Sequence, residues 1–200
     1  MGHRRRPLPR RRHRVSTEAT RPAKLLALSG AGFLARLSLS RHALARFPDI
    51  PVTQIAELER VETLSEAELG QTKPAQRDAQ QLLALAQKQA DEGMIANASM
   101  AIAVVDLQSH LPGQALPMAE AANRYFSSKG EKESEWLSLY YVAKACKASG
   151  DVTGSSINAK KALDILNEFE QTWSPPTYHQ YTTRPDHQII LHELVKSRST

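Results

Sequence analysis

The side chains of this sequence that could carry out chemistry include a group of histidines near the C-terminus. His179, His187 and His192 lie close together in the chain. Two histidines that bind one metal ion from the same face of a helix are usually four residues apart, whereas His187 and His192 are five apart. We therefore expect solvated or locally hydrogen-bonded histidines and predict no metal site.

The single cysteine, Cys146, excludes a disulfide within the chain and any site that needs several cysteines. Lys144 and Lys147 could lower the pKa of its thiol, but no histidine lies near it in the sequence. We expect Cys146 to be a small buried residue of an alanine-rich helix. The glutamates at positions 131, 133 and 135 are typical of a solvated loop and helix start, not of an acid–base pair. No P-loop or nucleophile-elbow motif is present, so the sequence predicts neither an enzyme nor a cofactor.

Charge divides the chain into a strongly basic N-terminal segment and a mildly acidic body. Residues 1–48 carry 12 Lys and Arg against one acid, Glu18, for a net charge of +11. The other 152 residues carry 14 bases and 20 acids, for a net charge of −6. Residues 1–24 hold almost nothing apolar that could be buried, so we expect them to be disordered, and we predict a basic leader or targeting segment over residues 1–48.

Three interpretations of this leader remain open. The first is a targeting segment, because the leader is rich in Arg and Ser and poor in acids. The second is a solvated tail or a misassigned start. The third is an arm that contacts phosphates. We expect a cytoplasmic protein, or an organelle-targeted or exported one if residues 1–45 are cleaved. No stretch of the chain is apolar for long enough to predict a transmembrane helix. The phosphate-contacting arm would consist of Arg4, Arg5, Arg6, Arg10, Arg11, Arg12 and Arg14.

The body repeats itself every 40 residues. The segments 77–90, 117–130 and 157–170 align with small residues in one column and larger ones in the columns that follow. Along each segment the four columns are three, three and one residues apart, and this spacing places them on one face of a helix. The segments 96–109 and 136–149 align at the same offset and are also good helices. Because no strand-like alternation interrupts them, we predict an all-α body of helical hairpins. The first column consists of Ala79, Ala119 and Ala159.

Residues 143–166, AKACKASGDVTGSSINAKKALDIL, resemble a tetratricopeptide repeat (TPR). Ala143 matches the small residue of its first helix, Gly150-Asp151-Val152 its turn, and Lys161-Ala162-Leu163 its closing segment. The spacing of 40 residues resembles the long-repeat variants of that superfamily. The resemblance implies a right-handed α-solenoid of TPR-like hairpins.

Other segments must flank the repeats, because repeats bury their apolar faces only against neighbours. We predict four regions: a basic leader (1–48), a linker with a possible capping helix (49–72), TPR-like repeats (73–172), and a loop with a C-terminal capping helix (173–200). Pro112-Gly113 is expected to end one repeat helix, Pro117 to open the next, and Asp186 to cap the final helix. Tyr178 and Tyr181 are expected to pack beneath that last helix.

The resemblance also implies where a partner would bind, since the first helix of each TPR hairpin lines a concave face. A groove with Met, Tyr and Lys would suit an acidic or mixed peptide, although Met100 and Tyr140 could equally be core residues. The segment 178–187 could form a second contact surface. The predicted concave-face residues are Asn97, Met100, Val104, Gln108, Leu137, Tyr140, Lys144 and Lys147.

Together these patterns predict a protein–protein interaction module, an adaptor or accessory subunit that could also form homo-oligomers. The alternative is a factor that associates with nucleic acid or a membrane surface through its Arg-rich arm. The identity of the partner is not encoded in any motif of the chain.

Overall fold

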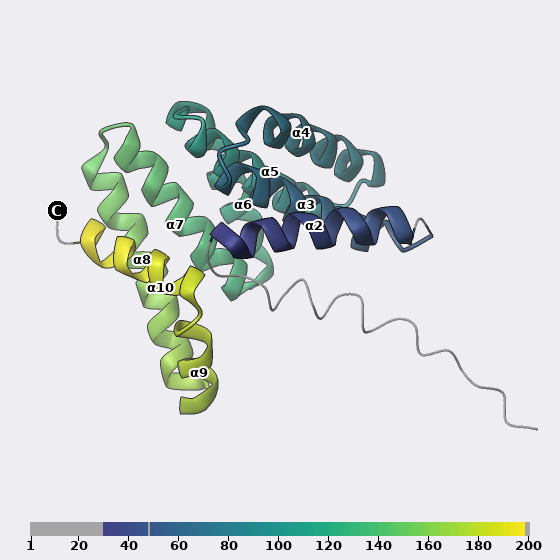
Figure 1. The fold of residues 1–200 in the computed structure, drawn as a ribbon. Coiled ribbons are helices and arrows are strands. Elements are labelled where there is room, and N and C mark those ends of the chain that lie inside the picture. Colours follow the sequence, from purple (N-terminus) through teal and green to yellow (C-terminus); the bar gives the residue numbers. More distant parts are fainter. Residues whose placement is uncertain (1–29, 48, 199–200) are drawn as a thin grey trace, which may run out of the picture.

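The computed structural model describes residues 30–47 and 49–198, and this part of the chain is all-α, without a strand. Consecutive helices pack against one another along the chain (Figure 1). The helices are α2 (Gly30–Arg46), α3 (Val52–Glu68), α4 (Thr72–Gln89), α5 (Glu92–Gln108), α6 (Pro112–Lys129), α7 (Lys132–Ala148), α8 (Val152–Thr172), α9 (Pro175–Thr182) and α10 (Pro185–Arg198).

The helices from α3 to α8 follow the predicted 40-residue period. The helices α3, α5 and α7 begin at residues 52, 92 and 132, and each is 17 residues long. The helices α4, α6 and α8 begin at residues 72, 112 and 152. The period therefore starts at residue 52, one helix earlier than the predicted repeat region, and the predicted linker at 49–72 is mostly helix α3.

A left-handed residue follows five of these helices at intervals of 20 residues. The residues with positive φ are Gly70, Ala90, His110, Gly130 and Gly150. This conformation ends a helix and satisfies its last carbonyl groups, and glycine adopts it without a steric cost. The same turn is thus built at His110 (φ 59°) without a glycine.

The helix boundary near Pro112 differs from the one predicted. Helix α5 ends at Gln108, and Pro112 is the first residue of α6, where its missing N–H costs nothing. Pro117 was expected to open this helix but lies inside it. Its ring is on an exposed face of α6, so the helix continues past it with one backbone hydrogen bond fewer. Asp186 lies in the first turn of α10, which begins at Pro185, and does not precede that helix as a cap.

Small buried residues hold the hairpins together. Ala79, Ala119 and Ala159 are at most 1% exposed, and the next column, Leu82, Ala122 and Ala162, is as deeply buried. A small side chain at a helix crossing allows the two backbones to approach closely. These two columns are therefore buried, as expected from their helical spacing. The column Leu85, Tyr125 and Ile165 is buried at Ile165 only.

Part of the segment expected to be a leader is instead helical. Residues 30–46 form α2, which packs against α3 and buries Leu37 and Ser40 (Figure 1). The helical body therefore includes residues 30–46, which were expected to belong to the leader. The seven arginines of the predicted phosphate-contacting arm, Arg4 to Arg14, lie outside the described residues.

The C-terminal helix folds back onto the last hairpin, as predicted. Helix α10 packs against α8 and α7 and buries Leu194. The indole Nε1 of Trp136 donates a hydrogen bond of 2.8 Å to the hydroxyl of Tyr181. The His187 ring lies edge-on to both of these rings. Tyr181 and the partly buried Tyr178 therefore pack against the core that α10 covers.

The alanine columns predict a specific sensitivity to added volume. Replacing Ala119, which is fully buried, with Leu should lower the free energy of unfolding by about 1–3 kcal/mol, because the added atoms must separate α6 from its neighbours. Chemical denaturation followed by circular dichroism measures this change. Glu120→Leu, at an exposed neighbouring position, should change the value by less than about 0.5 kcal/mol. Equal effects at the two positions would mean that this column does not set the distance between helices.

Candidate functional site

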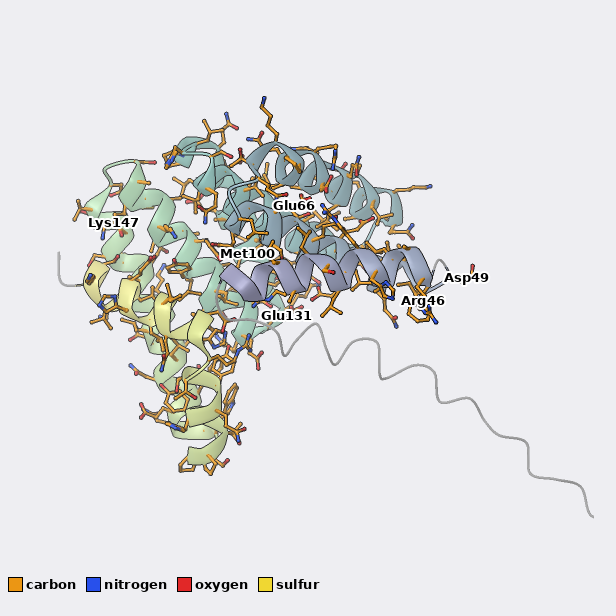
Figure 2. The ribbon with its side chains drawn as sticks, in the orientation of Figure 1. Arg46, Asp49, Glu66, Met100, Glu131 and Lys147 are labelled. Atoms are coloured by element: carbon orange, nitrogen blue, oxygen red, sulfur yellow. The ribbon has the colours of Figure 1, made fainter. Side chains whose placement is uncertain are left out.

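The predicted concave-face residues come from α5 and α7, and the structure buries two of them. Val104 is 3% exposed and Tyr140 is 5% exposed. Lys147 is exposed near the end of α7, and Met100 lies on α5 (Figure 2). The other members are half-buried: Asn97, Gln108, Leu137 and Lys144.

Helix α10 covers the part of this face that α7 provides. The Tyr140 hydroxyl donates a hydrogen bond of 2.5 Å to a carboxylate oxygen of Glu193, and the Lys144 ammonium lies 3.6 Å from the same oxygen. Lys144 also donates to the Tyr140 hydroxyl at 3.2 Å. Burial and this hydrogen bond raise the pKa of Tyr140 above its usual range, so the phenol stays neutral. Tyr140 therefore belongs to the core beneath α10.

The α5 part of the face is also engaged within the chain. Met100 packs against Ala122 and Phe126 of the next helix. The side-chain amide of Asn97 donates to the carbonyl oxygen of Gly93, one turn earlier, at 3.0 Å. Lys147 is the only one of the eight predicted residues that is classed as exposed, and all eight lie within the described residues.

An open groove of about 620 Å³ lies where α8 turns into α9, beside the first turn of α7. Two aromatic rings, Trp173 and Tyr181, line it together with side chains of both charges. The full lining is Glu133, Trp173, Ser174, Thr177, Gln180, Tyr181 and Arg184. We refer to it as the C-terminal groove.

Stacked rings hold the aromatic wall of the C-terminal groove in place. The Trp173 ring stacks on Phe169 at 4.5 Å between centroids and meets the Tyr181 ring edge-on at 5.1 Å. Because Tyr181 also accepts the hydrogen bond from Trp136, its hydroxyl is directed into the core. Burial raises the pKa of Tyr181 to about 12, so this wall is uncharged at neutral pH.

Arg184 and Glu133 supply the charges of the C-terminal groove. The Arg184 guanidinium lies 5.9 Å from the centroid of the Tyr181 ring and 2.9 Å from a carboxylate oxygen of Asp186. Glu133 is exposed in the first turn of α7. The groove thus presents an apolar surface between groups that can pair with either charge or with a peptide backbone.

The sequence singled out one part of this groove. Tyr181 and Arg184 belong to the segment 178–187, for which a second contact surface and local structural packing were both open. Trp173 and Glu133 were not predicted as binding residues, because only the fold brings α7 next to the end of α8. Trp173 could have been recognised as a candidate because it is an aromatic residue directly before Ser174-Pro175, where the helix must end.

The histidines near the C-terminus and the single cysteine are the other residues that could do chemistry. His187 is buried, whereas His179 and His192 are exposed. In the described part of the chain, no group of three potential metal ligands includes any of them. Cys146 is buried, and burial raises the pKa of its thiol, with Asp151 contributing in the same direction. It is therefore protonated and weakly reactive.

None of the protein-family models, curated proteins or solved structures compared with the chain matches it. The resemblance to tetratricopeptide repeats therefore rests on the residues of this chain alone. Among the described residues, no helix is long and apolar enough to cross a membrane.

The buried His187 predicts a pH dependence of stability. Burial disfavours the imidazolium and nearby Arg184 adds to the effect, so the pKa of His187 is below its ordinary value of 6.5. As the pH falls below about 6.5, the unfolded chain binds a proton at this histidine before the folded chain does. The free energy of unfolding should therefore decrease there, by at most about 1.4 kcal/mol per pH unit from this group.

Denaturation of His187→Asn at several pH values between about 7 and 5 measures this contribution. The variant should lose less stability on acidification than the unmodified chain does. His192→Asn, at an exposed site on the same helix, serves as the control and should behave like the unmodified chain. If the two variants show the same pH dependence, the account of His187 is contradicted.

Proposed function

We propose that this chain is a protein-binding module, an adaptor or accessory subunit without catalytic activity, that holds a peptide segment of another protein in the C-terminal groove. The observation that carries the proposal is the open groove lined by Trp173 and Tyr181 between Arg184 and Glu133. Tryptophan, tyrosine and arginine are the residue types that contribute most binding energy in protein interfaces.

The shape of the groove favours a peptide over a small enclosed ligand. Its volume of about 620 Å³ is enough for one or two large side chains, and it is widely open to solvent. An apolar or aromatic side chain of the partner would lie against Trp173. Exposed polar side chains at the rim, Thr177 and Gln180, can hydrogen-bond with the backbone of the same segment.

The groove is preorganised by the surrounding packing. Trp173 and Tyr181 are restrained by ring contacts with Phe169 and by the hydrogen bond from Trp136. A partner therefore does not need to order these side chains on binding, which lowers the entropic cost of association.

The predicted concave face remains a second candidate surface for the same function. Lys147 is exposed there, and the Lys144 side chain is 39% exposed beside its partner Glu193. These lysines would favour an acidic segment, whereas the C-terminal groove favours an apolar anchor. The two surfaces can be separated by substitution, because they involve opposite ends of α7.

The test is selection of binding peptides from a displayed random library on the full chain at physiological salt. We expect the selected peptides to share an aromatic or large aliphatic residue. Gln180→Arg, which places a long side chain in the groove, should weaken their binding at least about tenfold. His179→Arg adds the same charge at the adjacent exposed position outside the groove lining and should leave the affinity unchanged.

Three other outcomes would contradict the groove proposal. Failure to select any peptide would argue against a peptide-binding module. Loss of binding in Lys147→Glu, with binding retained in Gln180→Arg, would assign the function to the concave face. Retention of nucleic acid or anionic vesicles that falls steeply with added salt, with no selected peptide, would favour the Arg-rich arm of residues 4–14.

A further inference from the structure

Three carboxylates meet between the two helices of the first hairpin. Glu62 and Glu66 are one turn apart on α3, and Asp78 lies on α4 opposite them. One potential ligand oxygen from each of the three lies within 4.8 Å of the others. Glu62 and Asp78 also line a surface depression of about 430 Å³ together with Glu59 of α3. Glu66 is labelled in Figure 2.

Glu66 is the unusual member, because its side chain is fully buried. Its Oε1 atom accepts a hydrogen bond of 2.6 Å from the Arg41 guanidinium. Its Oε2 atom is buried without a hydrogen-bond partner. A buried carboxylate oxygen without a hydrogen-bond partner lowers the stability of the folded state. In folded proteins such an atom normally has a further partner.

Among the described residues, the acids around the cluster outnumber the arginines that pair with them. The acids are Glu59, Glu62, Glu66 and Asp78, whereas two arginines pair with them. Arg41 bridges Glu62 and Glu66 at 2.6 Å each, and Arg77 lies 2.6 Å from Asp78. With every acid ionised, four negative charges face the two positive charges of these arginines. Protons or a bound cation would reduce this excess.

We propose that Glu62, Glu66 and Asp78 bind a divalent cation of the hard, oxygen-preferring class, with calcium as the best fit. Calcium binds carboxylate oxygens at about 2.3–2.6 Å, so oxygens on opposite sides of one ion lie about 5 Å apart. All three oxygens lie within 4.8 Å of one another, so one ion of this class could contact all of them. Calcium tolerates irregular ligand geometry, whereas magnesium requires a near-ideal octahedron at about 2.0–2.1 Å. Carboxylates without nitrogen or sulfur ligands also disfavour zinc and copper.

Arg41 and the cation are alternative partners of the same carboxylates. The Arg41 side chain is 52% exposed, so it can move into solvent when a cation takes its place between Glu62 and Glu66. The exchange would replace ion pairs that join α2 to α3 with a bridge between α3 and α4. This inference concerns the opposite end of the helical array from the C-terminal groove and does not rest on the proposed function.

The experiment is calorimetric titration of the chelator-treated full chain with calcium chloride and with magnesium chloride at constant ionic strength. We expect saturable calcium binding that is tighter than magnesium binding. Glu66→Gln, which removes a buried ligand charge, should weaken calcium binding at least tenfold. Arg41→Gln should strengthen calcium binding, since it removes the competing guanidinium. Glu120→Gln removes one acid on α6 outside the cluster and should bind like the unmodified chain.

The unmodified chain alone can overturn the proposal. Absence of saturable binding up to about 10 mM calcium, well above the dissociation constants of weak extracellular calcium modules, would mean that the cluster is neutralised by its arginines and protons. Equal weakening in Glu66→Gln and Glu120→Gln would indicate a diffuse effect of charge and would also contradict it. Circular dichroism of each variant verifies that the fold is retained, and a variant that does not fold leaves the decision to the unmodified chain.

Discussion

Close contact between helices at small buried side chains is the constraint on which this architecture depends. The columns that contain Ala79, Ala119 and Ala159 repeat at an interval of 40 residues, and the left-handed turns repeat every 20. Helix length and turn position must therefore agree, because one extra residue in a helix would rotate its alanines away from the interface by about 100°. The repeated lengths of α3, α5 and α7 follow from this condition.

One buried position of the repeat carries a much larger side chain in the last hairpin, and this change explains why a groove forms at the C-terminal end. At equivalent positions of the 40-residue repeat, the buried residue is Ala56, then Ala96, then Trp136. The large ring of Trp136 gives Tyr181 and His187 a surface to pack on, so α10 can close the last hairpin. The aromatic residues beyond that core line the C-terminal groove. At the other end of the array, the buried side chains include an acid, Glu66.

Much of the fold could be predicted from local pattern, because helical spacing and the alanine columns are properties of neighbouring residues. The first hairpin was harder to recognise, since α3 has Thr63 where the other repeats have Ala103 and Ala143. Contacts between distant residues could not be predicted in this way. Glu193 covers Tyr140 from 53 positions away, and Asp78 meets Glu66 only after the hairpin closes. For the same reason the concave-face residues were chosen without knowledge of α10, which covers part of them.

The most direct test of the central claim, that the C-terminal groove holds a partner segment, is fluorine NMR of the full chain labelled with 5-fluorotryptophan. The chain has two tryptophans, so each state gives two signals, one from Trp136 in the core and one from Trp173 in the groove. Titration with a library-selected peptide should shift the Trp173 signal in a saturable way and leave the Trp136 signal nearly unchanged. Saturable binding by calorimetry with no change at Trp173 would contradict the account.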